Sequence, residues 1–163
     1  MTPERLPPPL ASGLFVMFVG TEPGPMSLRL GEYYADATNR FYQHLALTKF
    51  TPRRLSAADC WRLPDYGIGL DDVYDNPEGL RSRMEAVTPR AICFNSRGAL
   101  SRFVDPRPVG RLWRGAAAAQ YAEFDMLVWA TSDSSWNANQ HWPKRIDDLL
   151  ALQAALQGDA SPP

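Results

Sequence analysis

The chain has 163 residues, of which 45% are hydrophobic, and its formal net charge is −1. This length and composition exclude a disordered protein and predict one globular domain with a substantial core. The near-neutral charge argues against binding of nucleic acid through overall positive charge, although it leaves room for a local basic face.

Metal-binding residues are few and scattered. The chain has two cysteines and two histidines, and Cys60 and Cys93 stand singly in different segments. They cannot assemble a zinc framework or a four-cysteine iron–sulfur site, so we expect no metal and no other cofactor.

The ends of the chain predict its location and its boundaries. No apolar run approaches the roughly 20 residues of a transmembrane helix, and MTPERLPPPLASG lacks the apolar region of a secretory signal. We therefore expect a cytoplasmic protein without a membrane partner and, since nothing demands a partner chain, a monomer. Residues 1–13 are interpreted as a proline-rich arm, mobile or lying on the surface, residues 14–157 as a single domain, and residues 158–163 as a flexible tail.

A buried strand over residues 14–19 leads directly to a carboxylate. The apolar run LFVMFV breaks at Gly20, and a loop follows in which Glu22 lies among glycines and prolines. In open parallel sheets, ligands bind beyond the carboxyl ends of the strands, so Glu22 is a candidate site residue. The alternative is a solvated loop residue.

Two tyrosines precede a predicted helix. Tyr33 and Tyr34 come just before ADATNRFYQHLAL, in which Asp36 or Thr38 could cap a helix. The residues that this helix should turn inward are Phe41, Leu45 and Leu47. A tyrosine near the site loop could stack on a planar ring, or it could pack on the domain with its hydroxyl in water.

A second strand is predicted to reach the same rim. A short helix from Ser56 precedes GIGLDDV, in which Asp71 and Asp72 follow apolar residues. Two consecutive carboxylates at a strand end are further candidates for the site, and the alternative is a capping pair or an exposed turn. A helix is predicted over residues 80–86, and Pro89 ends it.

The third unit repeats the order of strand and helix. AICFN stops at Asn95, and SRGALSRFV follows with helical spacing. Asn95 carries both a donor and an acceptor, as discrimination between the carbonyl and amino edges of a base requires. It could equally cap the helix that begins at Ser96.

The last strand, MLVWATS, ends in a polar cluster from Thr131 to Ser135. Small hydroxyl residues at such a junction can donate hydrogen bonds to a phosphate, or they can form a helix cap. A C-terminal helix follows, with an apolar side predicted to contain Ile146, Leu149, Leu150, Leu152 and Leu156. The repeated strand–helix units predict an α/β fold.

Four stretches carry a resemblance to a known family. They read GTEPGPMSLRLGEYYADATNRFY, GIGLDDV, ICFNSRGALSRF and ATSDSSWNANQHWPKRIDDL. In order and spacing they resemble the uracil-DNA glycosylase superfamily, and most closely the mismatch-specific uracil/thymine glycosylases and their relatives that remove hypoxanthine. The resemblance covers residues 14–156 and implies a three-layer α/β/α sandwich with a central four-stranded parallel sheet.

The resemblance also implies chemistry on a nucleotide flipped out of DNA. The expected reaction is monofunctional hydrolysis of the N-glycosidic bond of uracil, with DNA containing uracil or another deaminated base as partner. The alternatives are a hypoxanthine or xanthine glycosylase and a DNA-binding relative that has lost turnover. The residues that match family positions fall into three groups: Glu22 and Asp72 as catalytic residues; Thr21, Tyr34 and Asn95 as base-binding residues; and Ser132, Ser134, Ser135, Trp136, Asn137 and Arg97 as DNA-binding residues.

Two departures from the family pattern bear on these roles. Glu22 stands where the family usually has Asn or Asp. The last motif has Asp133 and Trp136 in place of prolines, and an acid beside a phosphate-binding loop opposes DNA unless it turns away or caps the helix. Trp136 could fill the space left by an extruded base, or it could be buried.

Overall fold

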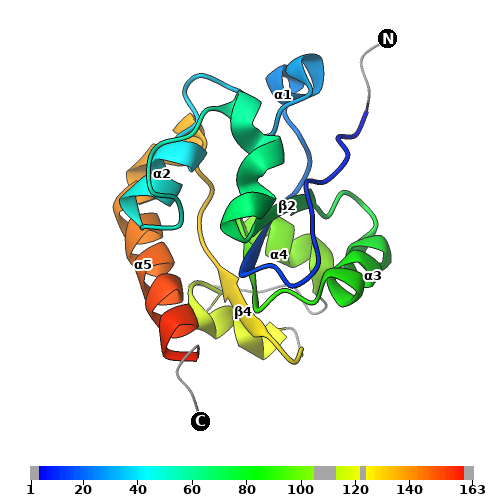
Figure 1. The fold of residues 1–163 in the computed structure, drawn as a ribbon, viewed down its shortest axis with the longest axis vertical. Helices are drawn as coiled ribbons and strands as arrows, with labels where there is room; N and C mark the ends of the chain where they lie inside the picture. The colour runs from blue at the N-terminus through cyan, green and yellow to red at the C-terminus, as the bar shows by residue number, and fades with distance from the viewer. Residues whose placement is uncertain (1–3, 105–112, 122–123, 160–163) are drawn as a thin grey trace.

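The computed structural model describes residues 4–104, 113–121 and 124–159, and it contains one parallel sheet covered by helices (Figure 1). The sheet has four strands in the order β2-β1-β3-β4. They are β1 (Val16–Gly20), β2 (Ile68–Asp72), β3 (Ala91–Phe94) and β4 (Leu127–Ala130). The four predicted strands are thus all present, and each pair of adjacent strands is parallel.

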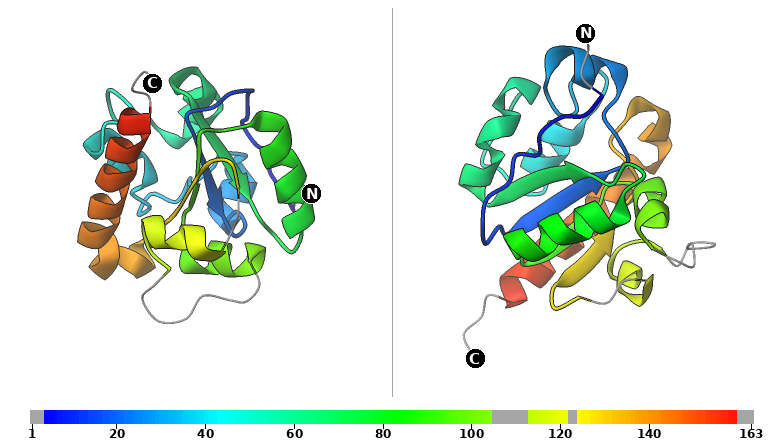
Figure 2. Two further views of the ribbon diagram at one scale, coloured as in Figure 1. Left: turned by 90° about the horizontal axis from the view of Figure 1, so that it is seen from below. Right: turned by 90° about the vertical axis from the view of Figure 1, so that its right-hand side faces the viewer.

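The strands are apolar on both faces because helices cover both faces. Alternate residues of β1 point to opposite sides, so that Phe18 belongs to one core cluster while Met17 and Val19 belong to the other. On the Phe18 side lie α2 (Phe41–Leu47), η1 (Ala57–Tyr66) and α5 (Trp142–Asp159). On the other side lie α3 (Pro77–Val87), α4 (Arg97–Phe103) and η2 (Ala116–Tyr121) (Figure 2). The protein is therefore a three-layer α/β/α sandwich.

Two short helices follow strand-end loops. They are α1 (Pro25–Leu30) and η3 (Trp136–His141). The sequence predicts only a loop before Asp36, and this is wrong because Pro25 sits at the first helical position, where its missing N–H costs nothing, and Gly31 ends the turn with φ of 70°. The next helix begins at Phe41 rather than at Asp36, whose carboxylate instead bonds Thr38 in a turn.

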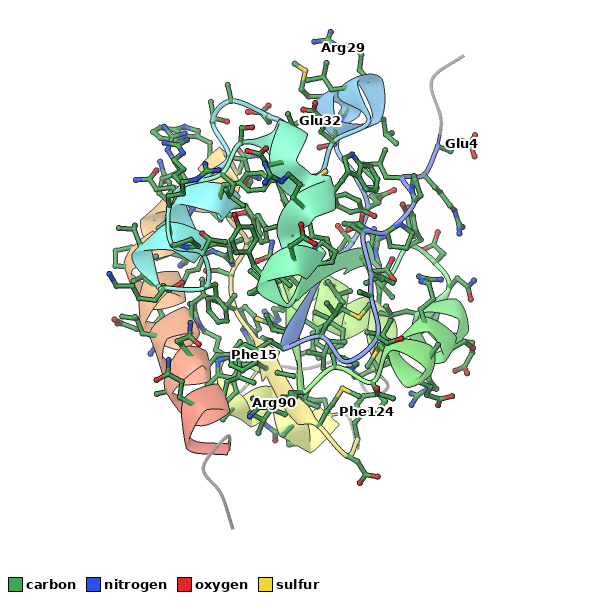
Figure 3. The ribbon with its side chains drawn as sticks, in the orientation of Figure 1. Glu4, Phe15, Arg29, Glu32, Arg90 and Phe124 are labelled. Atoms are coloured by element: carbon green, nitrogen blue, oxygen red, sulfur yellow. The ribbon has the colours of Figure 1, made fainter. Side chains whose placement is uncertain are left out.

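Two leucines expected in the core are on the surface. Leu47, at the last position of α2, and Leu150, on the outer side of α5, are both exposed. The buried face of α5 instead passes through Arg145, Leu149, Leu152 and Leu156. Charged side chains such as Glu4 and Arg29 project outward at the periphery (Figure 3).

The described part of the proline-rich arm lies on the domain. Leu6 is buried in the core cluster on the Phe18 side, and the carbonyl oxygen of Pro9 accepts a hydrogen bond from Leu70 N at 3.3 Å. The arm therefore covers part of the outer edge of β2. At the other end, α5 continues to Asp159, so Gly158 is helical rather than part of a tail. None of the helices in the described ranges is long and apolar enough to cross a membrane.

Candidate functional site

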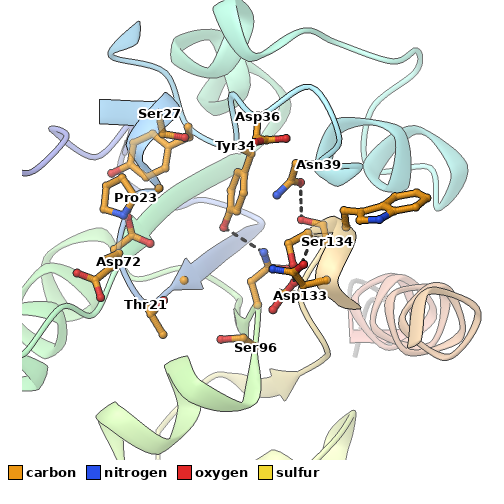
Figure 4. Close-up of a pocket in the computed structure, with 18 of the residues that line it drawn as sticks. Thr21, Pro23, Ser27, Tyr34, Asp36, Asn39, Asp72, Ser96, Asp133 and Ser134 are labelled. Carbon is orange, nitrogen blue, oxygen red and sulfur yellow. Dashed lines mark hydrogen bonds between the residues drawn. The ribbon is translucent and has the colours of Figure 1, made fainter. Parts of the chain in front are cut away.

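The carboxyl ends of β1, β2 and β3 meet at one pocket of about 460 Å³ (Figure 4). The register aligns these ends, with Gly20 opposite Asp72 and Val19 opposite Phe94. The loops that follow the strands, together with the segment before α2 and the loop before η3, form the walls. Of the predicted site residues, the pocket is lined by Thr21, Glu22, Tyr34, Asp72, Asn95, Ser134, Ser135, Trp136 and Asn137.

Gly20 lines the pocket, and two polar side chains approach it there. A Cβ at this position would lie 2.6 Å from Asp72 Oδ1 and 3.4 Å from the Tyr34 hydroxyl. Only glycine leaves room for both groups. Gly20 therefore permits a carboxylate and a phenol to sit side by side over the end of β1.

Glu22 lies at the mouth of the pocket. Its side chain is 59% exposed, and one carboxylate oxygen lies 3.1 Å from Arg102 Nη2 on α4. The carboxylate is thus both solvated and ion-paired, while its residue still lines the cavity. A carboxylate so placed can orient a water molecule that enters from the mouth.

The two aspartates at the end of β2 have different surroundings because adjacent strand residues point to opposite faces. Asp71 turns to α3, where Arg83 donates two hydrogen bonds to it at 2.6 and 3.2 Å. Asp72 turns into the pocket and is only 4% exposed. Burial, reinforced by the charges of Asp71 and Glu22, raises the pKa of Asp72 to about 7. Asp71 is therefore held by an ion pair, and Asp72 is the buried acid that faces the cavity.

Tyr34 stands in the middle of the pocket (Figure 4). Its backbone has φ of 55°, an uncommon left-handed conformation for a non-glycine residue, and its ring stacks on Phe41 with centroids 4.0 Å apart. Phe41 covers one face of the ring, so a planar ligand could stack only on the other. The neighbouring Tyr33 is buried, and its hydroxyl donates to Leu6 O.

Asn95 is fixed from behind by a buried arginine. Arg145 on α5 donates from Nη1 to Asn95 Oδ1 and to Ser132 O, and from Nε to His44 Nδ1 at 2.9 Å. The amide nitrogen of Asn95 then donates to the Tyr34 hydroxyl at 3.1 Å. Burial and the positive charge of Arg145 lower the pKa of His44 to about 3. His44 is therefore neutral and can accept the hydrogen bond from Arg145 Nε.

The loop between β4 and η3 is held by bonds to other elements and by bonds among its own residues. Ser134 donates to Asn39 Oδ1 at 2.8 Å, which ties the loop to the start of α2. Asp133 accepts hydrogen bonds from the backbone N–H and the hydroxyl of Ser135, the residue before η3. Asp133 thus closes a turn before η3, a helix without a side-chain cap, and it also lines the pocket. Beyond it Trp136 is 55% exposed at the rim.

Two predicted DNA-binding residues are outside the pocket. Ser132 is buried, and its carbonyl oxygen and hydroxyl contact Arg145 and Arg114. Arg97 is exposed at the first position of α4, beside Ser96 of the pocket lining.

Two further residues of the site, Asn39 and Arg145, had no predicted role. Asn39 belongs to the first motif of the resemblance, whereas Arg145 falls on the apolar stripe of α5, where a charged residue stands out. As for metals, among the described residues no group of three His, Cys, Asp or Glu side chains could hold an ion.

Comparison with known proteins supports the architecture. No model of a known protein family matches this chain. The chain is similar to the solution NMR structure of a protein from Methanosarcina acetivorans that is provisionally named a uracil DNA glycosylase, with a TM-score of 0.66 and 20% sequence identity. The match covers 94% of this chain and 98% of that chain. At this identity the likeness establishes the fold alone.

Proposed function

We propose that the protein is a DNA glycosylase that hydrolyses the bond between a deaminated base, uracil first, and its deoxyribose. The observation that carries the proposal is the convergence of Glu22, Asp72, Tyr34 and Asn95 on one cavity at the sheet edge. Its volume, about 460 Å³, is within the range of roughly 300–1,000 Å³ that is typical of small-molecule sites. The name of the Methanosarcina acetivorans protein supports the same class of reaction.

The base enters the pocket only after the nucleotide leaves the DNA stack. Flipping costs a few kcal/mol, least at a mismatch, and stacking and hydrogen bonds in the pocket offset this cost. The Tyr34 hydroxyl and the Asn95 amide lie together in the cavity and bond the edge of the base. Trp136, exposed at the rim, is positioned to contact DNA or to fill the space that the base has left.

The two carboxylates then divide the chemistry, because their environments differ. As the N-glycosidic bond breaks, its electron pair leaves with the base and the sugar gains positive charge. Glu22, ion-paired and open to solvent, stabilises this charge and takes a proton from the water whose oxygen bonds to the sugar carbon. Asp72, buried beside the Tyr34 hydroxyl, lies against the base. The proton that Glu22 has taken from water then passes to the departing base, which leaves in its neutral form.

The residues of the pocket favour hydrolysis without a covalent intermediate. A bifunctional glycosylase needs an amine that forms a Schiff base with the sugar. The two lysines of the chain, Lys49 and Lys144, are both in described segments and neither lines the pocket. We therefore expect intact abasic DNA as the product.

The test is a panel of oligonucleotides that carry uracil, hypoxanthine, xanthine or a thymine mismatch, each treated with alkali after incubation. Strand breaks at uracil support the proposal, and breaks only at hypoxanthine or xanthine move the substrate to deaminated purines. Retardation of the DNA without breaks at any base refutes the enzymatic function and leaves a DNA-binding protein.

The catalytic assignment has its own test. Glu22→Gln should lower the rate of excision by about 100-fold or more, because a general base contributes roughly 10²–10⁴-fold, while DNA binding stays nearly unchanged. Glu78→Gln on α3 is the matched control, since Glu78 is exposed and outside the pocket. Full activity of Glu22→Gln would move the catalytic role to Asp72.

A further inference from the structure

The hydrogen bonds behind the pocket have a fixed direction. Arg145 is fully buried, and a guanidinium group can donate hydrogen bonds but cannot accept them. Its bond with Asn95 must therefore end on the amide oxygen, so the amide nitrogen is turned toward Tyr34. An asparagine side chain alone could adopt either orientation. Arg145 selects one.

The direction of hydrogen-bond donation that Arg145 sets extends to the pocket. Because the Tyr34 oxygen accepts from Asn95, its own hydrogen remains to be donated. Within the described residues the Tyr34 hydroxyl donates no hydrogen bond, and it lies close to Gly20 in the pocket lining. We name Arg145, Asn95 and Tyr34 the donor chain, since each member donates to the next and the last faces the cavity.

The charge at the start of the donor chain is unusual. No carboxylate of the described residues forms an ion pair with Arg145, and its Nη2 has no hydrogen-bond partner among them. Asp133 and Asp148 act on it only through longer-range electrostatics. A buried cation without a paired anion is costly, and its field strengthens the donors in front of it.

This arrangement matches the difference between a deaminated base and its parent. Deamination replaces an exocyclic amine, which donates hydrogen bonds, by a carbonyl, which accepts them. Building on the function proposed above, we propose that Arg145 is a positioning residue that makes the Asn95–Tyr34 side of the pocket a hydrogen-bond donor. The pocket thereby selects the carbonyl of uracil over the amine of cytosine, and the carbonyl of hypoxanthine over the amine of adenine.

The test measures binding rather than turnover. The probes are duplexes in which uracil or cytosine stands opposite the same non-pairing base, on a fluorinated deoxyribose that resists cleavage, and anisotropy gives the ratio of their affinities. We expect the protein to prefer uracil by about 10-fold or more, the worth of one or two hydrogen bonds to the correct edge. A ratio near one for the unmodified protein overturns the proposal.

Tyr34→Phe isolates the last donor, because it keeps the ring and removes only the hydroxyl. We expect the uracil preference to fall by about 3- to 10-fold. Thr51→Val is the matched control, since it also removes a buried hydroxyl, one that donates to Arg53 O at 2.8 Å, and neither residue lines the pocket. An unchanged preference in Tyr34→Phe overturns the donor chain.

Arg145→Lys and Arg145→Gln test the start of the donor chain. Both shorten the side chain, but lysine can only donate, whereas glutamine can also accept and so releases the Asn95 amide. We expect Lys to keep most of the uracil preference and Gln to lose it, and equal behaviour of the two overturns the proposal. If circular dichroism shows either variant to be unfolded, Tyr34→Phe decides alone. Cleavage of uracil DNA without the Tyr34 effect refutes the donor chain only, and selective binding without cleavage refutes the glycosylase only.

Discussion

Gly20 shows how one missing side chain makes the pocket possible. Gly20→Ala would place a Cβ 2.6 Å from Asp72 Oδ1, so the buried acid must move. A displacement of about 1 Å in a catalytic group can cost on the order of 100-fold in rate, and we expect a loss of this size in excision assays. Gly158→Ala, at a position with no atom near the added Cβ, should leave the rate unchanged.

Asp72 gives a pH dependence with a definite sign. Its pKa is raised from the ordinary value to about 7, so between these values the folded protein keeps a proton that the unfolded chain has released. The free energy of unfolding therefore falls as pH rises through this interval and levels off above it. Asp72→Asn removes this pH dependence. We expect the free energy of unfolding of the variant to exceed that of the wild type by on the order of 3 kcal/mol at pH 8 and by much less at pH 5.

Urea unfolding of both proteins at the two pH values checks this prediction. The difference between them isolates Asp72 from His44, whose lowered pKa makes stability rise with pH below its ordinary value. A difference that does not change with pH would show that Asp72 is ionised in the folded protein throughout.

Among single residues, those at the strand ends were easier to predict from the sequence than the buried residues that contact them. Glu22, Asp72 and Asn95 line one pocket because parallel strands bring their carboxyl ends to one edge. Arg145 was not predicted, because a charged side chain in an amphipathic helix is ordinarily assigned to the solvent side. Its position four residues before Leu149 places it on the buried stripe, but the sequence does not show what it binds.

Helix α4 depends on a single cap. The Ser96 hydroxyl accepts a hydrogen bond from Ala99 N at 2.9 Å, as expected for the start of a helix predicted at this serine. Ser96→Ala should lower the free energy of unfolding by about 1 kcal/mol. Ser82→Ala, an exposed site within α3, is the control and should change it by less than about 0.5 kcal/mol. Equal effects of the two substitutions would show that the cap adds nothing.

Among the elements, the strands were easier to predict than the short helices. Each strand is a compact apolar run ended by a polar or glycine residue, which is a strong local signal. Helix α1 has 6 residues, too few for a helical period to show, and its Pro25 and Gly31 are also typical of loops. The short helices form through their contacts with the domain, which local sequence does not reveal.

The proline-rich arm packs on the edge strand and reaches one of the two core clusters. Leu6 is buried in the core, and Pro9 O pairs with Leu70 N on the edge strand β2. Deletion of residues 1–9 should lower the free energy of unfolding by at least about 2 kcal/mol, because it removes a buried leucine and leaves an open strand edge. Urea unfolding and light scattering measure both effects, and an unchanged midpoint without aggregation would show that the arm is dispensable.

The layered α/β architecture follows from the order of strands and helices along the chain, and the structure confirms it. The order β2-β1-β3-β4 and the packing of the arm depend on contacts between distant segments, which periodicity does not report. The arm is an example, since its prolines suggested only a surface segment while Leu6 reaches the core.

The placement of β1 between β2 and β3 has a consequence for protein synthesis. The ribosome makes this strand first, yet both of its neighbours in the sheet are translated much later. The loop around Trp136 and the arginine behind Asn95 are translated after the other parts of the pocket. A growing chain thus carries Glu22 long before any chamber exists around it, and an interrupted translation product contains no assembled pocket.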